Sequence, residues 1–293
     1  MIIHQEVHDS AQLSITRATE LLEVSRSGYY KHCTKPAPDP EILNREEKIK
    51  VEMHTIAGER TRYGYRRMTV ELANREFKVN HKKVLRLMHE ESLLCSQKRK
   101  YKPITTNSNH AFQVYPNLVK EVDTTGPDQI WVSDITYIPL DNKFVYLATI
   151  LDQHTKRCIG WDLSHNIDTQ LTLNALKRAV KTREGKDLTG LIHHSDQGVQ
   201  YAATEYVNYL SEYHISISMS SKGNPYENAF AESFFKTVKY EEVYLNEYEN
   251  FRQLFSNLRN YIDGMYNSKR LHSSIGYKSP INFEREVAIN TIS

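Results

Sequence analysis

Three strand-like runs follow one another with only short polar joins in the second half of the chain, and no other sequence feature restricts its fold more. The runs cover residues 129–140, 143–152 and 158–164 and are rich in Ile, Val, Tyr and Trp. Runs of this kind with short connections predict an antiparallel meander. A hairpin turn is expected at Asp141 and Asn142, because Asp and Asn tolerate tight turns.

Helical and strand patterns alternate after the meander. We expect a helix capped by Asp168, then a strand, a helix, a short strand and a further helix, at residues 169–182, 189–195, 203–213, 214–219 and from about 227. This order predicts an α/β fold in which helices cover both faces of a mixed five-stranded sheet. The expected core domain spans residues 124–286, and residues 287–293 form a tail.

The first part of the chain is predicted to be helical. Residues 1–35 suggest a helix-turn-helix whose second helix is capped by Ser25 and presents Arg26, Ser27 and Tyr29 outward. A Pro-rich join at 36–40 precedes a second helical domain at 41–102, and residues 103–123 form a polar linker. In this second domain Asn80 is expected to cap a helix that buries Val84, Leu85 and Met88.

Positive charge is concentrated in the second helical domain. The formal net charge of the chain is only +2, but residues 60–102 hold 13 Lys or Arg and 4 Asp or Glu, a balance of +9. Such a concentration predicts contact with a polyanion, although a solvated helical face explains it equally well. The candidate DNA-binding residues of this region are Arg62, Arg66, Arg67, Lys82, Lys83, Arg86, Lys98, Arg99 and Lys100.

Composition excludes several protein classes. The chain has no run of 18 apolar residues, so no membrane-spanning helix is expected. The N-terminus lacks the pattern of a signal peptide. Cys33, Cys95 and Cys158 form no close pair, which argues against structural zinc and against a disulfide framework. A cytoplasmic protein is therefore expected.

Three acidic residues carry the expected chemistry. Asp134 lies within the first strand, Asp196 follows a buried strand at its carboxyl end, and Glu232 lies on a helix, separated from Asp196 by 35 residues. Ligands of open α/β sheets bind at the carboxyl ends of strands. A single Asp in a domain of this size is more often a cap or a surface charge. Three acids in this order on these elements instead predict a site for a divalent metal pair.

Magnesium suits this site best. It prefers oxygen ligands, and two ions held about 3.5–4 Å apart stabilise both the attacking and the leaving oxygen of a phosphodiester displacement. Mn²⁺ accepts the same ligands and is expected to substitute. Lys239 lies two helical turns after Glu232 and could hold a phosphate. His193 and His194 are expected to be structural, with His194 as a supporting partner of the site.

Five ordered motifs resemble the transposases of the insertion-sequence-three family, in particular the product of the second reading frame. They are Trp131–Tyr137, His194–Tyr201, Gly223–Ala229, Glu232–Lys239 and Tyr266–Pro280. Two stretches of the basic region, Arg62–Arg67 and Val79–Met88, resemble the helical domain of the same family. The resemblance extends over nearly the whole chain.

The resemblance implies a ribonuclease-H-like core, as in retroviral integrases, with an Asp-Asp-Glu triad at Asp134, Asp196 and Glu232. It implies magnesium-dependent cleavage of one strand at each element end and transfer of the freed 3′-hydroxyl. The implied partner is double-stranded DNA, both the terminal inverted repeats and the target. A dimer or higher assembly is expected on DNA, and the protein is expected at the bacterial nucleoid when it acts.

Members of the family often act as a fusion with an upstream helix-turn-helix and leucine-zipper segment. This chain shows no sustained heptad, so that portion is expected to be absent from it, and an upstream-frame helix-turn-helix protein or a fusion segment is the expected partner. The Tyr266–Pro280 motif has two readings. Lys269 and Arg270 contact backbone phosphate in the first, and the segment closes the core in the second.

Two other functions are compatible with the residues. The protein could be a DNA-binding repressor or accessory subunit with a silent core, in which case DNA binding would survive chelation of metal. It could also be a magnesium nuclease that stops at hydrolysis and forms no joined product.

Overall fold

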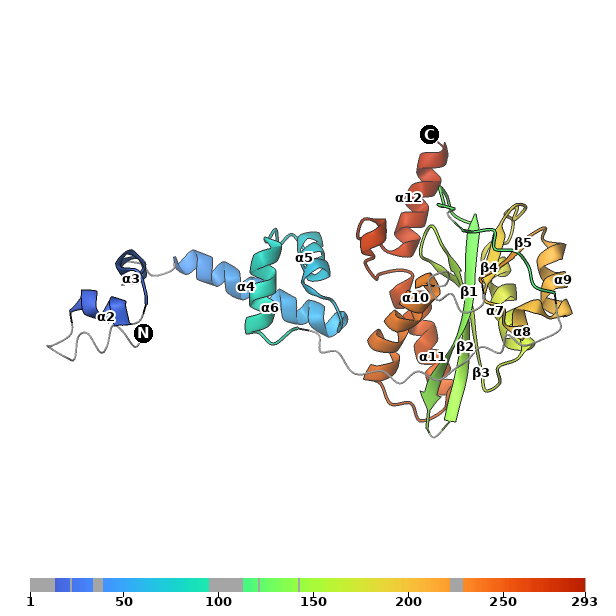
Figure 1. Ribbon diagram of the computed structural model, residues 1–293, viewed down its shortest axis with the longest axis horizontal. Helices are drawn as coiled ribbons and strands as arrows, with labels where there is room; N and C mark the ends of the chain where they lie inside the picture. Colours follow the sequence, from blue (N-terminus) through green and yellow to red (C-terminus); the bar gives the residue numbers. More distant parts are fainter. Residues whose placement is uncertain are drawn as a thin grey trace. The chain divides into compact units, whose positions relative to one another are not determined.

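The structure is a computed structural model that describes residues 14–21, 23–33, 39–94, 113–120, 122–141, 143–221 and 229–292. The chain forms two compact units, Met1–Thr55 and Ile56–Ser293. Figure 1 shows helices at the amino-terminal end and the sheet with its helices in the rest of the chain. None of the described helices is long and apolar enough to cross a membrane.

The first unit is helical, as the sequence predicts. Its helices α2 (Ile15–Leu21) and α3 (Arg26–Cys33) are joined by a short turn in which Glu23 adopts a φ of +52°. Ser25 caps α3, since its hydroxyl accepts a hydrogen bond of 3.1 Å from the backbone N–H of Gly28. The long helix α4 (Pro40–Glu59) begins in this unit.

Helices α5 (Tyr65–Asn74) and α6 (His81–Glu90) belong to the second unit. Asn80 caps α6 as predicted, because its side chain accepts from the N–H of Lys82 at 2.8 Å. The predicted buried face of α6 was wrong at one position. Leu85 is 41% exposed, and Leu87 is buried with Val84 and Met88 instead. The spacing of Val84, Leu87 and Met88 follows one face of a helix of 3.6 residues per turn.

The sheet has five strands in the order β3-β2-β1-β4-β5. Its bounds are β1 (Ile130–Leu140), β2 (Lys143–Asp152), β3 (Cys158–Ser164), β4 (Ile192–Ser195) and β5 (Ser216–Met219). The first three strands pair antiparallel, whereas β1–β4 and β4–β5 pair parallel. The predicted meander and mixed sheet are confirmed, and Asp141 has a φ of +53° at the expected turn.

Helices cover both faces of the sheet (Figure 1). One face packs against α7 (Thr169–Thr182), α8 (Val199–Ala202) and α9 (Thr204–Glu212), and its core includes Trp131, Leu176 and Tyr206. The other face packs against α10 (Ala229–Glu241) and α11 (Phe251–Arg259), with Val132 and Phe234 in the core. Asp168 caps α7 as predicted by accepting from the N–H of Leu171 at 2.9 Å. The ribonuclease-H-like arrangement is thus formed.

The C-terminal region is more helical than expected. After the short η2 (Val243–Leu245) and α11, the chain forms a π-helical segment, η3 (Asn260–Tyr266), then η4 (Ser273–Ile275) and α12 (Pro280–Ile292). Helix α12 therefore includes most of the residues that were expected to form a tail.

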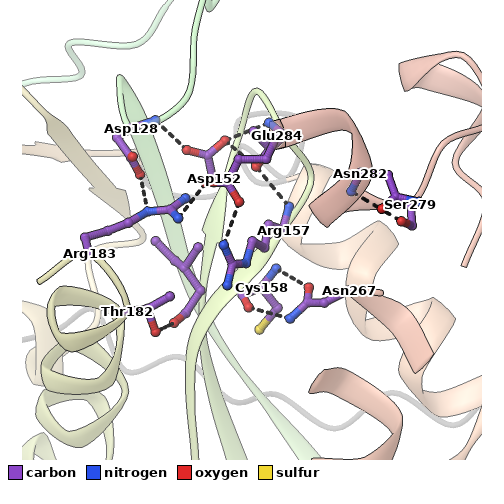
Figure 2. Close-up of polar contacts among 12 residues, drawn as sticks. Asp128, Asp152, Arg157, Cys158, Thr182, Arg183, Asn267, Ser279, Asn282 and Glu284 are labelled. Atoms are coloured by element: carbon purple, nitrogen blue, oxygen red, sulfur yellow. Dashed lines mark hydrogen bonds and ion pairs between the residues drawn. The ribbon is translucent and has the colours of Figure 1, made fainter. Parts of the chain in front are cut away.

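A polar network ties α12 to the sheet (Figure 2). The carboxylate of Glu284 forms ion pairs of 2.6 Å with Arg157 and 2.5 Å with Arg183. Arg183, whose side chain is 2% exposed, also contacts Asp128 at 2.7 Å. An acid on each side neutralises the buried guanidinium, so this network fixes the end of the chain on the core.

Candidate active site

Asp134 lies on β1, and Asp196 directly follows β4, the parallel neighbour of β1. In the register of β1 and β4, Val132 is the partner of His194, and each acid comes two residues further along its chain. Asp134 lies on the sheet face that packs against α10, because Val132 on the same face belongs to that core. Glu232 lies in the first turn of α10. The strand that carries Asp134 thus contacts both β4, which Asp196 follows, and α10, which carries Glu232.

The Asp134 carboxyl has a raised pKa because of burial and of neighbouring charges. Burial raises the pKa of Asp134 well above its ordinary value, and the negative charges of Asp196 and Glu232 raise this pKa further. Two interactions lower this pKa: a hydrogen bond of 2.8 Å that the carboxylate accepts from the N–H of Ile135, and the positive charge of Lys239. A half-buried carboxylate beside two others needs positive charge to remain ionised.

The loop after β4 fixes the Asp196 side chain. Its Oδ1 accepts a hydrogen bond of 3.0 Å from the N–H of Gly198. A Cβ at position 198 would lie 2.9 Å from the same oxygen, so glycine allows the carboxylate its place. Asp196 is half-buried and Glu232 is exposed.

The donor set suits a hard divalent cation, because it consists of carboxylates whose mutual repulsion such an ion would relieve. In the described parts of the chain, no three His, Cys, Asp or Glu side chains are already arranged around one ion position. Binding would therefore require a side chain to rotate, and the exposed Glu232 on α10 has the space to do so.

Both histidines beside Asp196 have structural partners. Nε2 of His193 lies 2.9 Å from the hydroxyl of Tyr206, and burial lowers the pKa of this imidazole to about 3. Nδ1 of His194 lies 2.9 Å from Oγ of Ser218, which also accepts from the N–H of Leu118. Both rings are buried and hydrogen-bonded inside the sheet layer, which agrees with the structural role expected for them.

Two tyrosines contact neighbours of the acids, and the sequence did not predict them as site residues. The hydroxyl of Ser133 donates to Tyr201 at 3.1 Å, directly beside Asp134 in the chain. Burial raises the pKa of the Tyr201 phenol, and the charges of Asp134 and Asp196 add to this rise. Tyr137 lies under the ammonium group of Lys239. Tyr137 belongs to the motif Trp131–Tyr137 and Tyr201 to the motif His194–Tyr201. Membership of these motifs is the sequence feature that could have identified them.

The candidate DNA-binding residues differ in their surroundings. Arg66 and Lys82 are exposed, Arg62 and Lys83 are half-buried, and Arg86 forms an ion pair of 2.6 Å with Glu90. Burial lowers the pKa of Arg67, which lies over the Tyr63 ring. Lys98, Arg99 and Lys100 lie outside the described residues, as does the loop at 223–228.

The two basic residues of the C-terminal motif have opposite environments. Lys269 is exposed, whereas Arg270 is 4% exposed and holds both carboxylate oxygens of Glu241 at 2.7 to 3.0 Å. Tyr261 donates to the same carboxylate at 2.8 Å. Arg270 thus closes the core in this structure, and Lys269 is the exposed basic residue of the motif.

The helical motif and the C-terminal motif meet in the second unit. The N–H of Leu271 donates to the hydroxyl of Tyr63 at 2.9 Å. A cavity of about 260 Å³ lies nearby, lined by Arg66, Arg67, Ser273 and Tyr277 among others. Two segments that are distant in the sequence therefore share one basic surface.

Family models match two regions of the chain. Residues 124–225 and 213–280 match integrase core domain families, and residues 44–101 match an HTH-like domain family. Among solved structures, the chain resembles a simian T-cell lymphotropic virus intasome chain with a TM-score of 0.46 at 16% identity, covering 80% of this chain and 74% of that one. A structure of the HTLV-2 integrase catalytic core domain in complex with magnesium matches with a TM-score of 0.41 at 16% identity. This match covers 55% of this chain and 98% of that one.

Curated relatives are much closer in sequence. An uncharacterized 31 kDa protein of the insertion element IS600 from Shigella sonnei is 38% identical, and the match covers 91% of this chain and 97% of that protein. The transposase for insertion sequence element IS904 from Lactococcus lactis is 36% identical, and the match covers 87% of this chain and 98% of that protein. The transposase InsF for IS3A from Escherichia coli is 32% identical, and the match covers 94% of this chain and 96% of that protein. With its integrase core and HTH-like domain, the chain belongs to the family of insertion-sequence transposases represented by the IS3 proteins.

Proposed function

We propose that this transposase cuts and joins the DNA at the ends of its element with Asp134, Asp196 and Glu232 as ligands of two Mg²⁺ ions. The observation that carries the proposal is that β1, which holds Asp134, contacts both β4 and the helix of Glu232, so that the charges of Asp196 and Glu232 raise the pKa of the half-buried Asp134. Three mutually repelling acids at the carboxyl end of β4 are costly to fold without a counter-charge. The ions would supply that charge and stabilise the oxygens that enter and leave the phosphorus.

The residues of the chain perform the remaining tasks. Asp134 on β1, Asp196 after the paired strand β4 and Glu232 in the first turn of α10 would together hold the ions. Lys239, in the last turn of the same helix, is placed to bind a phosphate of the substrate strand. Water serves as the nucleophile in cleavage, and the freed 3′-hydroxyl of the DNA serves in joining.

DNA with inverted terminal repeats is the proposed substrate, and an assembly of two or more chains holds both ends. The exposed Arg66 and Lys82 and the exposed Lys269 are the proposed phosphate contacts outside the active site. Because such contacts release counter-ions, affinity for DNA should fall steeply as salt increases. A separate or fused upstream helix-turn-helix segment would add recognition of the ends.

The test is an end-joining reaction with labelled element-end duplex, target DNA and Mg²⁺ or Mn²⁺. Asp134→Asn and Glu232→Gln should each abolish both the nicked and the joined product while DNA binding in EDTA persists. Full activity in either variant would refute the triad. A nicked product without a joined product would identify a nuclease, and binding without any product from the wild-type chain would identify a repressor.

A further inference from the structure

The cavity of about 260 Å³ in the second unit is lined by the first turn of α5 and by the loop of the C-terminal motif. Helix α5 contributes Arg66 and Arg67, and the loop contributes Ser273 and Tyr277. Arg66 and Ser273 are exposed, so the cavity opens to solvent, whereas Arg67 and Tyr277 are half-buried. None of the described residues that line the cavity is acidic. Its walls therefore offer two guanidinium groups and two hydroxyl groups.

Hydrogen bonds hold both walls of this cavity in place. The hydroxyl of Tyr63, just before α5, accepts from the N–H of Leu271 at 2.9 Å. In the loop, the N–H of His272 donates to the carbonyl of Lys278 at 3.0 Å, and the N–H of Tyr277 donates to the carbonyl of His272 at 2.8 Å. These bonds maintain Tyr277 at a φ of +57°, which is unfavourable for a bulky residue. A ligand would thus enter a preformed site.

Arg67 carries a positive charge that no acid pairs with. Its guanidinium lies 5.8 Å from the centre of the Tyr63 ring, and its Nε is buried without an acceptor among the described residues. The charge of Glu241 acts on Arg67, but Arg270 already holds that carboxylate through three hydrogen bonds of 2.7 to 3.0 Å. Two arginines thus share one carboxylate. The half-buried charge that is left over is costly unless an anion neutralises it.

The neighbouring His272 responds to the same excess of positive charge. Its Nε2 lies 3.3 Å from Nη1 of Arg270. Burial lowers the pKa of its imidazole most, and the charges of Arg270, Arg67 and Lys156 lower it further, to about 2. The imidazole is therefore neutral at neutral pH, and cations from three segments of the chain act on this one place. Such surroundings favour an anion as the ligand.

We propose that this cavity binds one backbone phosphate of DNA, held by Arg67 and Arg66 from the helical domain and by Ser273 from the core. Arginine and serine side chains are common donors to phosphate oxygens, and contacts of this kind position DNA without reading its sequence. The two walls belong to the HTH-like and integrase core regions, so one phosphate would fix both on the same DNA molecule. The assignment rests on the proposed function, which supplies DNA as the ligand.

Arg67→Met tests the assignment, because methionine keeps an unbranched side chain over the Tyr63 ring and removes the charge and the donors. Binding of element-end duplex is measured by fluorescence anisotropy in EDTA between about 50 and 200 mM salt. We expect Arg67→Met to bind about tenfold more weakly, with a log–log salt slope smaller by about one unit. Its melting temperature without DNA should be unchanged or higher, since an unneutralised charge is gone. Arg67→Lys, which keeps the charge, should bind more tightly than Arg67→Met.

Ser273 provides a second test, because its hydroxyl should contact the same phosphate. Ser273→Ala removes an exposed hydroxyl and should weaken binding about threefold without changing the salt slope. When it is combined with Arg67→Met, the loss should be smaller than the product of the two single losses, because contacts to one phosphate depend on each other. Arg252→Met, which alters an exposed arginine of α11 outside the cavity, is the matched control and should bind as the wild type does.

Three outcomes would overturn the assignment. The first is wild-type affinity and salt slope in Arg67→Met. If inorganic phosphate at constant ionic strength then raises the melting temperature of the wild type but not of this variant, the cavity takes a small phosphorylated ligand instead of DNA.

The second outcome is a loss of affinity that accompanies a lower melting temperature and is not restored in Arg67→Lys, which would show that Arg67 only packs against Tyr63. The third is a double variant whose loss equals the product of the single losses, which would place Arg67 and Ser273 on different parts of the DNA. Because binding in EDTA needs no catalysis, failure of the acids in the joining reaction remains a separate result.

Discussion

Lys239 holds its ammonium group 4.0 Å from the centre of the Tyr137 ring, so the last turn of α10 is linked to the strand that carries Asp134. The face of an aromatic ring attracts a cation, and the contact contributes about 0.5–2 kcal/mol depending on exposure. Tyr137 therefore positions the lysine that is proposed to bind the substrate phosphate.

Substitution of this ring should affect the reaction without disturbing the fold. We expect Tyr137→Leu to reduce the rate of strand joining by about 2- to 30-fold, which corresponds to the loss of the cation–π energy. Tyr137→Phe keeps the ring and is the control. Equal loss of activity in both variants would assign the effect to the hydroxyl and contradict the positioning role.

Removal of the Asp134 charge should stabilise the metal-free protein. Burial and two neighbouring acids raise the pKa of Asp134 above its ordinary value of 3.8, so ionisation costs more in the folded state than in the unfolded chain. The cost is absent below pH 3.8, develops as pH rises, and is complete above the raised pKa. Asp134→Asn should therefore melt higher than the wild type at pH 8, by about 2–4 °C for each kcal/mol relieved.

Thermal unfolding in EDTA at pH 4 and pH 8 checks this expectation. The advantage of Asp134→Asn should shrink at pH 4. An equal advantage at both values, or a lower melting temperature at pH 8, would mean that the carboxylate is not a source of electrostatic strain.

Magnesium should relieve the repulsion among the three carboxylates in the wild-type chain. Ions that bind only the folded state stabilise it by about 1.4 kcal/mol at ten times the dissociation constant. We expect Mg²⁺ to raise the melting temperature of the wild type and to have little effect on Glu232→Gln. Glu247→Gln, which alters an exposed acid after η2, should respond as the wild type does. An equal magnesium response in Glu232→Gln would remove this residue from the ligand set.

The C-terminal motif should divide into one structural and one DNA-binding residue. Arg270→Ala leaves the Glu241 carboxylate half-buried beside Tyr261 without its counter-charge, and breaking such a pair costs about 3–5 kcal/mol of unfolding free energy. Lys269→Ala should change stability by less than about 0.5 kcal/mol but weaken binding to duplex DNA. Urea unfolding and anisotropy measure the two effects, and an exchange of these phenotypes would contradict the assignment.

Gly160 should tolerate no side chain. A Cβ at this position in β3 would lie 2.2 Å from the carbonyl oxygen of Ala175 and 2.7 Å from the N of Ala179, so α7 would have to move away from the sheet. We expect Gly160→Ala to destabilise the core by about 1–3 kcal/mol in urea unfolding. Gly264→Ala, where the added methyl group has no neighbour within 4 Å, is the control and should be neutral or slightly stabilising.

Much of the fold is predictable from the sequence because local signals and tertiary packing agree. The meander is marked by β-branched and aromatic runs, and the caps at Ser25, Asn80 and Asp168 have side chains that accept backbone N–H groups. The error at Leu85 arose because two leucines, Leu85 and Leu87, compete for one face of α6. Helical periodicity alone did not decide between them.

The C-terminal region and the basic residues were less predictable for a different reason. The π-helical segment Asn260–Tyr266 interrupts the 3.6-residue period, and α12 lacks a clear apolar stripe, so pattern reading gives little there. A sequence also cannot distinguish Arg270 from Lys269, since their difference depends on Glu241, which lies 29 residues away in the chain. The sequence predicted which strands and helix carry the three acids. It did not predict the contact of Lys239 with Tyr137, because that contact depends on how α10 packs against β1.

The attachment of α12 by Glu284 has a consequence for how the protein is made. The ion pairs of Glu284 with Arg157 and Arg183 join the end of the chain to a turn and a helix that emerge from the ribosome more than one hundred residues earlier. Until translation reaches Glu284, the nascent core lacks the carboxylate that pairs with Arg157 and Arg183. Products interrupted upstream of residue 284 would leave Arg157 without that partner, and we expect cellular proteases to remove them before they can assemble with intact copies.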